Sequence, residues 1–156
     1  MVVILGFIRY NYTTMKNGDV FFTHSNALLG RLIRFITGAK VSHVGILVEL
    51  EGILFAVEMT AHGCEMRPKD VRFKDPKIIP FVATPKHLPS DFKKLVIKDV
   101  GRIKYDFWGL FMAPFYRTKG QEKICSEWIS NILGLKFPGL TREITPVDIF
   151  NVLFNE

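Results

Sequence analysis

Residues 43–58 read HVGILVELEGILFAVE, and this stretch predicts a β-hairpin. Every second side chain of its first half is apolar, as expected for a strand with one buried face: Val44, Ile46, Val48 and Leu50. Glu51-Gly52 is a two-residue sequence suited to the tight turn between antiparallel strands. We therefore expect two paired strands, over residues 43–50 and 53–58, with His43 on the face opposite the apolar stripe.

The register of this hairpin decides whether His43 and Glu58 can meet. With a two-residue loop, Gly45 pairs with Glu58, which places Glu58 diagonal to His43 on the same face. A four-residue loop would pair His43 with Glu58 directly, whereas a three-residue loop would put them on opposite faces. Gly45, which has no side chain, is expected to leave room for the carboxylate to reach the imidazole. A contact between His43 and Glu58 thus requires an even-numbered loop.

Short strands and helices are predicted on both sides of the hairpin. Apolar runs at residues 2–8 and 20–23 predict strands, and a helix is expected from Ser25 to a stop at Gly38. Residues 66–89 contain five prolines and predict loops with one strand at 78–82.

The chain after residue 89 predicts three further elements. Ser90 is expected to cap a helix that stops at Gly101, and residues 125–133 predict a helix ended by Gly134. Thr145 followed by proline predicts the start of a C-terminal helix. This mixture of strands and helices predicts an α+β fold.

Composition favours one globular domain over residues 1–156. The chain has 156 residues, 48% of them hydrophobic, which suffices for one core. Its net charge of +6 arises from 21 basic and 15 acidic residues that are scattered along the sequence. No nucleic-acid-binding motif accompanies them, so no nucleic-acid partner is expected.

The cysteines and the N-terminus bear on the compartment. Two cysteines, Cys64 and Cys125, are too few for a disulfide-stapled scaffold, which favours a reducing compartment. The first ten residues lack the features of a signal peptide and are too short to span a bilayer. We expect a cytoplasmic protein, or one exported by another factor.

Cys125 is a candidate nucleophile because it stands at the predicted start of a helix. Unpaired backbone N–H groups and the helix dipole stabilise a thiolate at that position. Free cysteine is also a common core residue, so Cys125 alone does not distinguish a nucleophile from a packing residue. His43 as base and Glu58 as its partner would complete a catalytic triad.

Six short motifs in the chain resemble one protein family. They are Gly18-Asp19-Val20, Ser42-His43-Val44-Gly45-Ile46, Ala56-Val57-Glu58, Tyr105-Asp106, Cys125-Ser126-Glu127-Trp128 and Thr145-Pro146-Val147-Asp148-Ile149. In this order they resemble the circularly permuted branch of the NlpC superfamily, the YiiX- and YebB-like cysteine hydrolases, which are related to lecithin-retinol acyltransferase. The resemblance implies a papain-like fold, with an antiparallel sheet or small barrel packed against helices.

The resemblance also implies roles for individual residues. Cys125 would be the nucleophile, His43 the base and Glu58 the third member, in agreement with the hairpin geometry. Tyr105 would help to hold the oxyanion beside the backbone N–H of Cys125, although it could equally be a packing residue. No cofactor or metal is implied.

Other readings stay open at this point. A metal site at His62, Cys64 and His43 is disfavoured because the chain lacks paired cysteines at zinc-ligand spacing. The substrate could be a peptide or other amide, or an acyl chain of a lipid held as a thioester, and peripheral contact with a membrane or cell wall is possible. The aromatic residues 105–116 could line an acyl pocket or belong to the core. A non-catalytic binding module is the third alternative.

Overall fold

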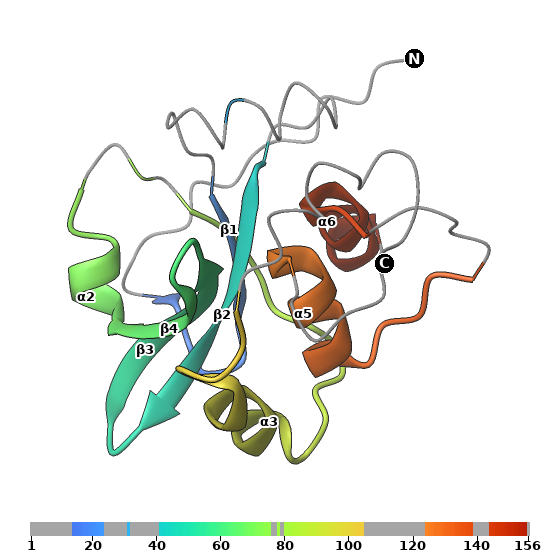
Figure 1. Ribbon diagram of the computed structural model, residues 1–156. Coiled ribbons are helices and arrows are strands. Elements are labelled where there is room, and N and C mark those ends of the chain that lie inside the picture. The colour runs from blue at the N-terminus through green and yellow to red at the C-terminus, as the bar shows by residue number, and fades with distance from the viewer. Residues whose placement is uncertain are drawn as a thin grey trace.

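The centre of the fold is a five-stranded antiparallel sheet with strand order β4-β3-β2-β1-β5 (Figure 1). The computed structural model describes residues 14–23, 31, 41–75, 78, 80–104, 124–138 and 144–155. The strands are β1 (Val20–Thr23), β2 (His43–Leu50), β3 (Ile53–Thr60), β4 (Gly63–Pro68) and β5 (Phe81–Ala83). The described strands form an open sheet, so the α+β class is confirmed and the sheet is not a small barrel.

The predicted hairpin is confirmed in its register. Leu50 pairs with Ile53 and Gly45 with Glu58, as a two-residue loop requires. The loop residues Glu51 and Gly52 both have positive φ, 50° and 79°, which is the backbone geometry of the tight hairpin turn. His43 and Glu58 therefore lie on the same face of the sheet.

Helices cover the two faces of the sheet unequally. Figure 1 shows α3 (Phe92–Asp99), α5 (Cys125–Leu133) and α6 (Pro146–Asn155) on one side and the short α2 (Lys69–Arg72) on the other. The larger core lies under α5, where Trp128 and Ile129 pack with the apolar stripe of β2. The opposite face carries a smaller cluster, made of Met15, Phe21, Leu47, Ala56, Phe73 and Val82.

Helix ends follow the predicted caps, with one exception. Gly134 adopts the left-handed conformation after α5, with φ of 65°, and α6 begins at Pro146, so both predictions are confirmed. The Asp148 carboxylate accepts hydrogen bonds from both the backbone N–H and the hydroxyl of Thr145, at 2.7 Å each. Ser90 was the wrong cap for α3, since Asp91 is its N-cap and makes no side-chain capping hydrogen bond.

The prediction of loops over residues 66–89 was wrong at its start and partly right at its end. Strand β4 runs to Pro68 and continues into α2, and β3 extends two residues beyond Glu58. Strand β5 overlaps the predicted strand 78–82 in its last two residues only. Residue 78 lies outside the strand, and the Ile78 N–H donates to the Asp75 carbonyl at 3.0 Å.

Several predicted segments lie outside the described residues. These are the strand at 2–8, the helix from Ser25 to Gly38 apart from residue 31, and the aromatic stretch 105–116. Within the described part of the chain, no helix is long and apolar enough to cross a membrane.

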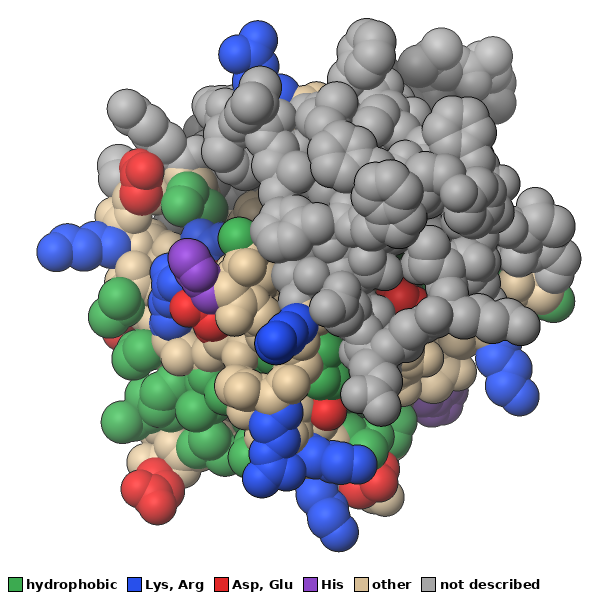
Figure 2. Space-filling model, in the orientation of Figure 1, with side chains coloured by type: hydrophobic (Ala, Val, Ile, Leu, Met, Phe, Trp, Pro, Cys, Tyr) green, Lys and Arg blue, Asp and Glu red, His purple; other side chains and the backbone are tan. Residues whose placement is uncertain are grey.

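Basic side chains gather over α3, although they are scattered in the sequence. Figure 2 shows Lys and Arg side chains together at this end of the molecule. Lys94, Lys98, Arg102 and Lys104 are exposed there, and Lys93 is half-buried. This basic surface lies at the end of β2 far from His43, because Lys93 Nζ donates to the Glu49 carbonyl at 3.0 Å.

Candidate active site

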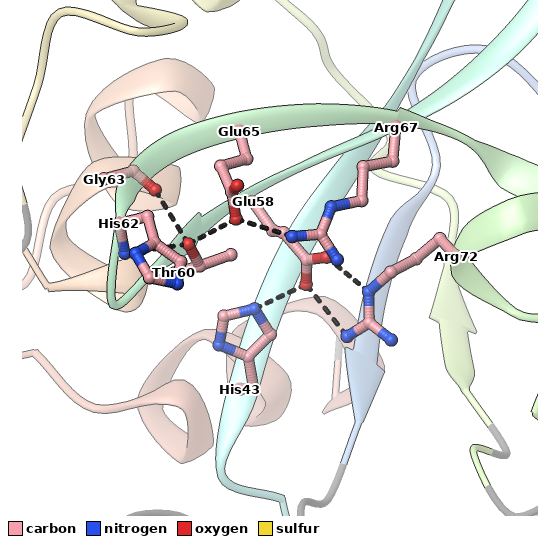
Figure 3. A network of polar contacts seen from close by, with 8 residues as sticks. All are labelled: His43, Glu58, Thr60, His62, Gly63, Glu65, Arg67 and Arg72. Carbon is pink, nitrogen blue, oxygen red and sulfur yellow. Dashed lines mark hydrogen bonds and ion pairs between the residues drawn. The ribbon is translucent and has the colours of Figure 1, made fainter.

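The β2–β3 hairpin brings His43 and Glu58 into direct contact. Nε2 of His43 lies 2.7 Å from Oε2 of Glu58, across the diagonal that the Gly45–Glu58 pairing sets (Figure 3). The Glu58 side chain is only 3% exposed, whereas that of His43 is 18% exposed. Solvent therefore reaches this pair from the imidazole side.

Gly45 has a packing role in addition to the one expected. A Cβ at this position would collide with the Phe21 ring and would lie 2.8 Å from the Val57 carbonyl oxygen. Phe21 is the cross-strand partner of Gly45 in β1, and its ring fills the space over the glycine. The absence of a side chain at Gly45 is thus required by the Phe21 ring, and the expectation that it also makes room for the carboxylate stays a prediction.

Arg72 is a functional candidate that the sequence did not indicate. From α2 its guanidinium faces the Glu58 carboxylate with two groups: Nε pairs with Oε1, and Nη2 donates to Oε2 at 3.0 Å. Figure 3 shows His43 and Arg72 both pointing at this carboxylate. Glu58 is therefore held between an imidazole and a guanidinium.

Helix α5 places Cys125 at its first position, as predicted. Ile124 is the N-cap and offers no side-chain hydrogen bond, while its carbonyl accepts the N–H of Trp128 at 3.0 Å. Two side chains of α5 bind neighbouring segments. Trp128 Nε1 donates to Asp99 Oδ2 of α3 at 2.9 Å, and the Ser126 hydroxyl donates to the Ile144 carbonyl before α6. The sulfur of Cys125 thus sits at a rigidly held helix N-terminus, where backbone N–H groups favour negative charge.

Cys125 and Glu58 both act on the protonation of His43. Burial lowers the pKa of His43, but hydrogen bonds with Cys125 and with Glu58, and then their charges, raise this pKa to about 10. Because Nε2 faces Glu58, Nδ1 is the ring nitrogen left for the sulfur. The fold therefore brings Cys125, His43 and Glu58 into one chain of contacts, whereas Tyr105 lies outside the described residues.

Glu58 is held in its ionised form. Burial raises the pKa of its carboxyl, but the hydrogen bond and charge of His43, followed by those of Arg72, lower it to about 2. A carboxylate flanked by an imidazolium can keep that ring oriented and charged while it exchanges protons with a thiol.

The second cysteine has a contrasting environment. Cys64, on β4, is 2% exposed, the same as Cys125. Burial, and then the charges of Asp99 and Glu65, raise the pKa of the Cys64 thiol to about 12. His62 is exposed in the β3–β4 turn, and no three metal-ligating side chains gather in the described part of the chain.

Comparison with known proteins adds no assignment. No protein-family model matches the chain, and no curated protein matches it in sequence.

Proposed function

We propose that this protein is a cysteine hydrolase of permuted papain-like architecture, in which Cys125 is the nucleophile, His43 the base and Glu58 the residue that orients the histidine. One observation carries the proposal: the His43 imidazole on β2 lies 2.7 Å from the Glu58 carboxylate on β3, and Cys125, at the start of α5, is near enough to raise the pKa of His43. A histidine between a thiol and a carboxylate is the arrangement that activates a cysteine for attack on a carbonyl.

The reaction follows from these three groups. The Cys125 thiolate attacks the substrate carbonyl carbon, forming a carbon–sulfur bond and a tetrahedral oxyanion. The backbone N–H of Cys125, at the start of α5, is the donor placed to stabilise that oxyanion. The oxyanion collapses as the carbon–nitrogen bond breaks, and the His43 imidazolium gives its proton to the departing amine. Water then attacks the thioester, His43 takes its proton, and the acid leaves with Cys125 restored.

The order of the elements supports the permuted architecture. The histidine strand precedes the cysteine helix in the chain, and that helix packs on an antiparallel sheet through the apolar stripe of β2. The motif order in the sequence is the same. A papain-like fold with its segments in permuted order is consistent with both observations.

We propose an amide or peptide substrate, since amide hydrolysis is the chemistry that the sequence resemblance implies most directly. The experiment compares peptidoglycan fragments with phospholipid vesicles as substrates, with products and protein adducts read by mass spectrometry. Cys125→Ala is compared with Cys64→Ala, which removes the other equally buried cysteine. We expect amide cleavage by the wild type and by Cys64→Ala, and none by Cys125→Ala.

Two results would overturn parts of this proposal. A fatty-acyl adduct on Cys125 without cleavage of any peptide would replace the amidase with a thioester-forming acyl hydrolase or acyltransferase. Loss of both signals in the wild type would leave a binding module that does not catalyse.

A further inference from the structure

Arg72 lies at the end of the short helix α2 and contacts Glu58, the third residue of the proposed triad. Helix α2 has four residues, no buried side chain and no side-chain N-cap. Among its attachments to the sheet are Arg72, whose side chain is 15% exposed and contacts Glu58, and the buried Phe73 that follows it. The guanidinium also lies 5.5 Å from the centroid of the Phe73 ring. The only charge that α2 brings against the buried carboxylate is thus that of Arg72.

A second arginine–glutamate ion pair on the same sheet face, Arg67 with Glu65, serves as a comparison because it is exposed to solvent. Glu65 is directly opposite Glu58 on β4, and Arg67 Nη2 donates to Glu65 Oε2 at 2.9 Å. Arg67 and Glu65 are 47% and 28% exposed, so water screens this pair. In contrast, the Arg72 and Glu58 side chains are only 15% and 3% exposed, and the pair shares an oxygen, Oε2, with His43.

We propose that Arg72 is a positioning residue of the active site, which holds the Glu58 carboxylate so that Oε2 stays directed at His43. The proposal rests on the function proposed above for Cys125 and His43, and it extends the triad to a chain of four residues. The fork of the guanidinium fixes both carboxylate oxygens, which a single hydrogen bond to the imidazole cannot do.

The charge of Arg72 has a second consequence. The guanidinium keeps Glu58 ionised, and an ionised Glu58 favours the protonated form of His43. The other charged or titratable groups on the described elements around Glu58 are His43 on β2, Cys125 beyond it on α5, Glu65 and Arg67 on β4, and the pair Lys69 and Asp70 on α2. Glu65 lies directly opposite Glu58 on the neighbouring strand. A like charge at this position disfavours the ionised form of Glu58, and the Arg72 cation opposes that effect.

The test follows the pH dependence of iodoacetamide labelling at Cys125 in Arg72→Met, with Arg67→Met as the matched control. Without the guanidinium Glu58 takes up a proton at higher pH, so the acidic limb of the labelling profile should move up by about one pH unit or more. Arg67→Met removes an equivalent arginine from the neighbouring glutamate and should leave that limb in place. Arg72→Lys keeps the charge but not the fork, so it should leave the acidic limb near its wild-type position while labelling becomes slower at every pH.

Two outcomes would overturn the role of Arg72. One is an Arg72→Met profile that coincides with the wild type, and the other is labelling that slows equally at every pH with no displacement of the limb. If Arg72→Met fails to fold, Arg72→Gln, which keeps a donor without the charge, is expected to show the same displacement. A folded Arg72→Gln without it would contradict the proposal.

A separate readout keeps this test independent of the proposed hydrolase activity. The NMR signals of the His43 ring report protonation of Glu58 without any reaction at Cys125, and the acidic transition should move up in Arg72→Met. Absence of labelling at Cys125 in the wild type would count against the nucleophile, whereas an unmoved His43 transition would count against Arg72.

Discussion

At the scale of single residues, the geometry of the site depends on the packing of the Phe21 ring over Gly45 as well as on the contacts of its titratable groups. The Phe21 ring covers Gly45 and packs edge-on against Phe73, with ring centroids 5.2 Å apart. Phe73 directly follows Arg72, so the position of the arginine is tied to the packing over Gly45. A side chain at Gly45 would disturb this whole stack.

We therefore predict that Gly45→Ala lowers the free energy of unfolding by about 1–3 kcal/mol, the usual cost of overpacking a core. Urea denaturation measures this loss. The same substitution should cost less in a Phe21→Leu background, because the smaller side chain leaves part of the required space. An equal cost in both backgrounds would show that Phe21 is not what excludes a side chain at Gly45.

At the scale of elements, the predictable parts are those with a local signal. The hairpin could be predicted because its alternating apolar side chains and Glu51-Gly52 turn fix both period and register, and with them the diagonal contact of His43 with Glu58. The end of α5 could be predicted from Gly134, and the start of α6 from the Thr145-Pro146 cap.

The elements that carry Arg72 have no such signal. Strand β4 reads GCEMRP and lies at the edge of the sheet: its alternation of apolar and charged side chains lasts only four residues, from Cys64 to Arg67, and ends at a proline. Helix α2 is too short for an apolar period and lacks a capping side chain. Arg72 reaches Glu58 only through tertiary packing, so sequence reasoning had no means of finding it.

At the scale of the whole molecule, the site links stability to pH in two directions. The folded pKa of Glu58 is about 2 against an ordinary 4.5, so its stabilisation is present above pH 4.5 and is lost as the pH falls toward 2. The folded pKa of His43 is about 10 against an ordinary 6.5, so its stabilisation is present below pH 6.5 and is lost as the pH rises toward 10. Both contributions are complete only between these two ordinary values.

Thermal unfolding measured from about pH 3 to about pH 9 should therefore give the highest melting temperature between pH 4.5 and pH 6.5, where both groups contribute fully. His43→Gln should reduce the fall on the alkaline side, because the folded state then no longer binds the extra proton. His62→Gln, which replaces an exposed histidine of the β3–β4 turn, should leave the fall unchanged. An alkaline fall in His43→Gln as steep as that of the wild type would contradict this linkage.

The most direct test of the central claim, that Cys125 is an activated nucleophile, compares the two cysteines in one reaction. Both are 2% exposed, so burial alone gives them equal access to iodoacetamide. At neutral pH a cysteine activated by His43 should react, whereas Cys64, whose pKa burial raises to about 12, stays protonated. Mass-spectrometric mapping should show Cys125 labelled at least about tenfold faster than Cys64, and His43→Gln should remove the difference. Equal labelling of the two cysteines, or faster labelling of Cys64, would contradict the assignment of Cys125 as the nucleophile.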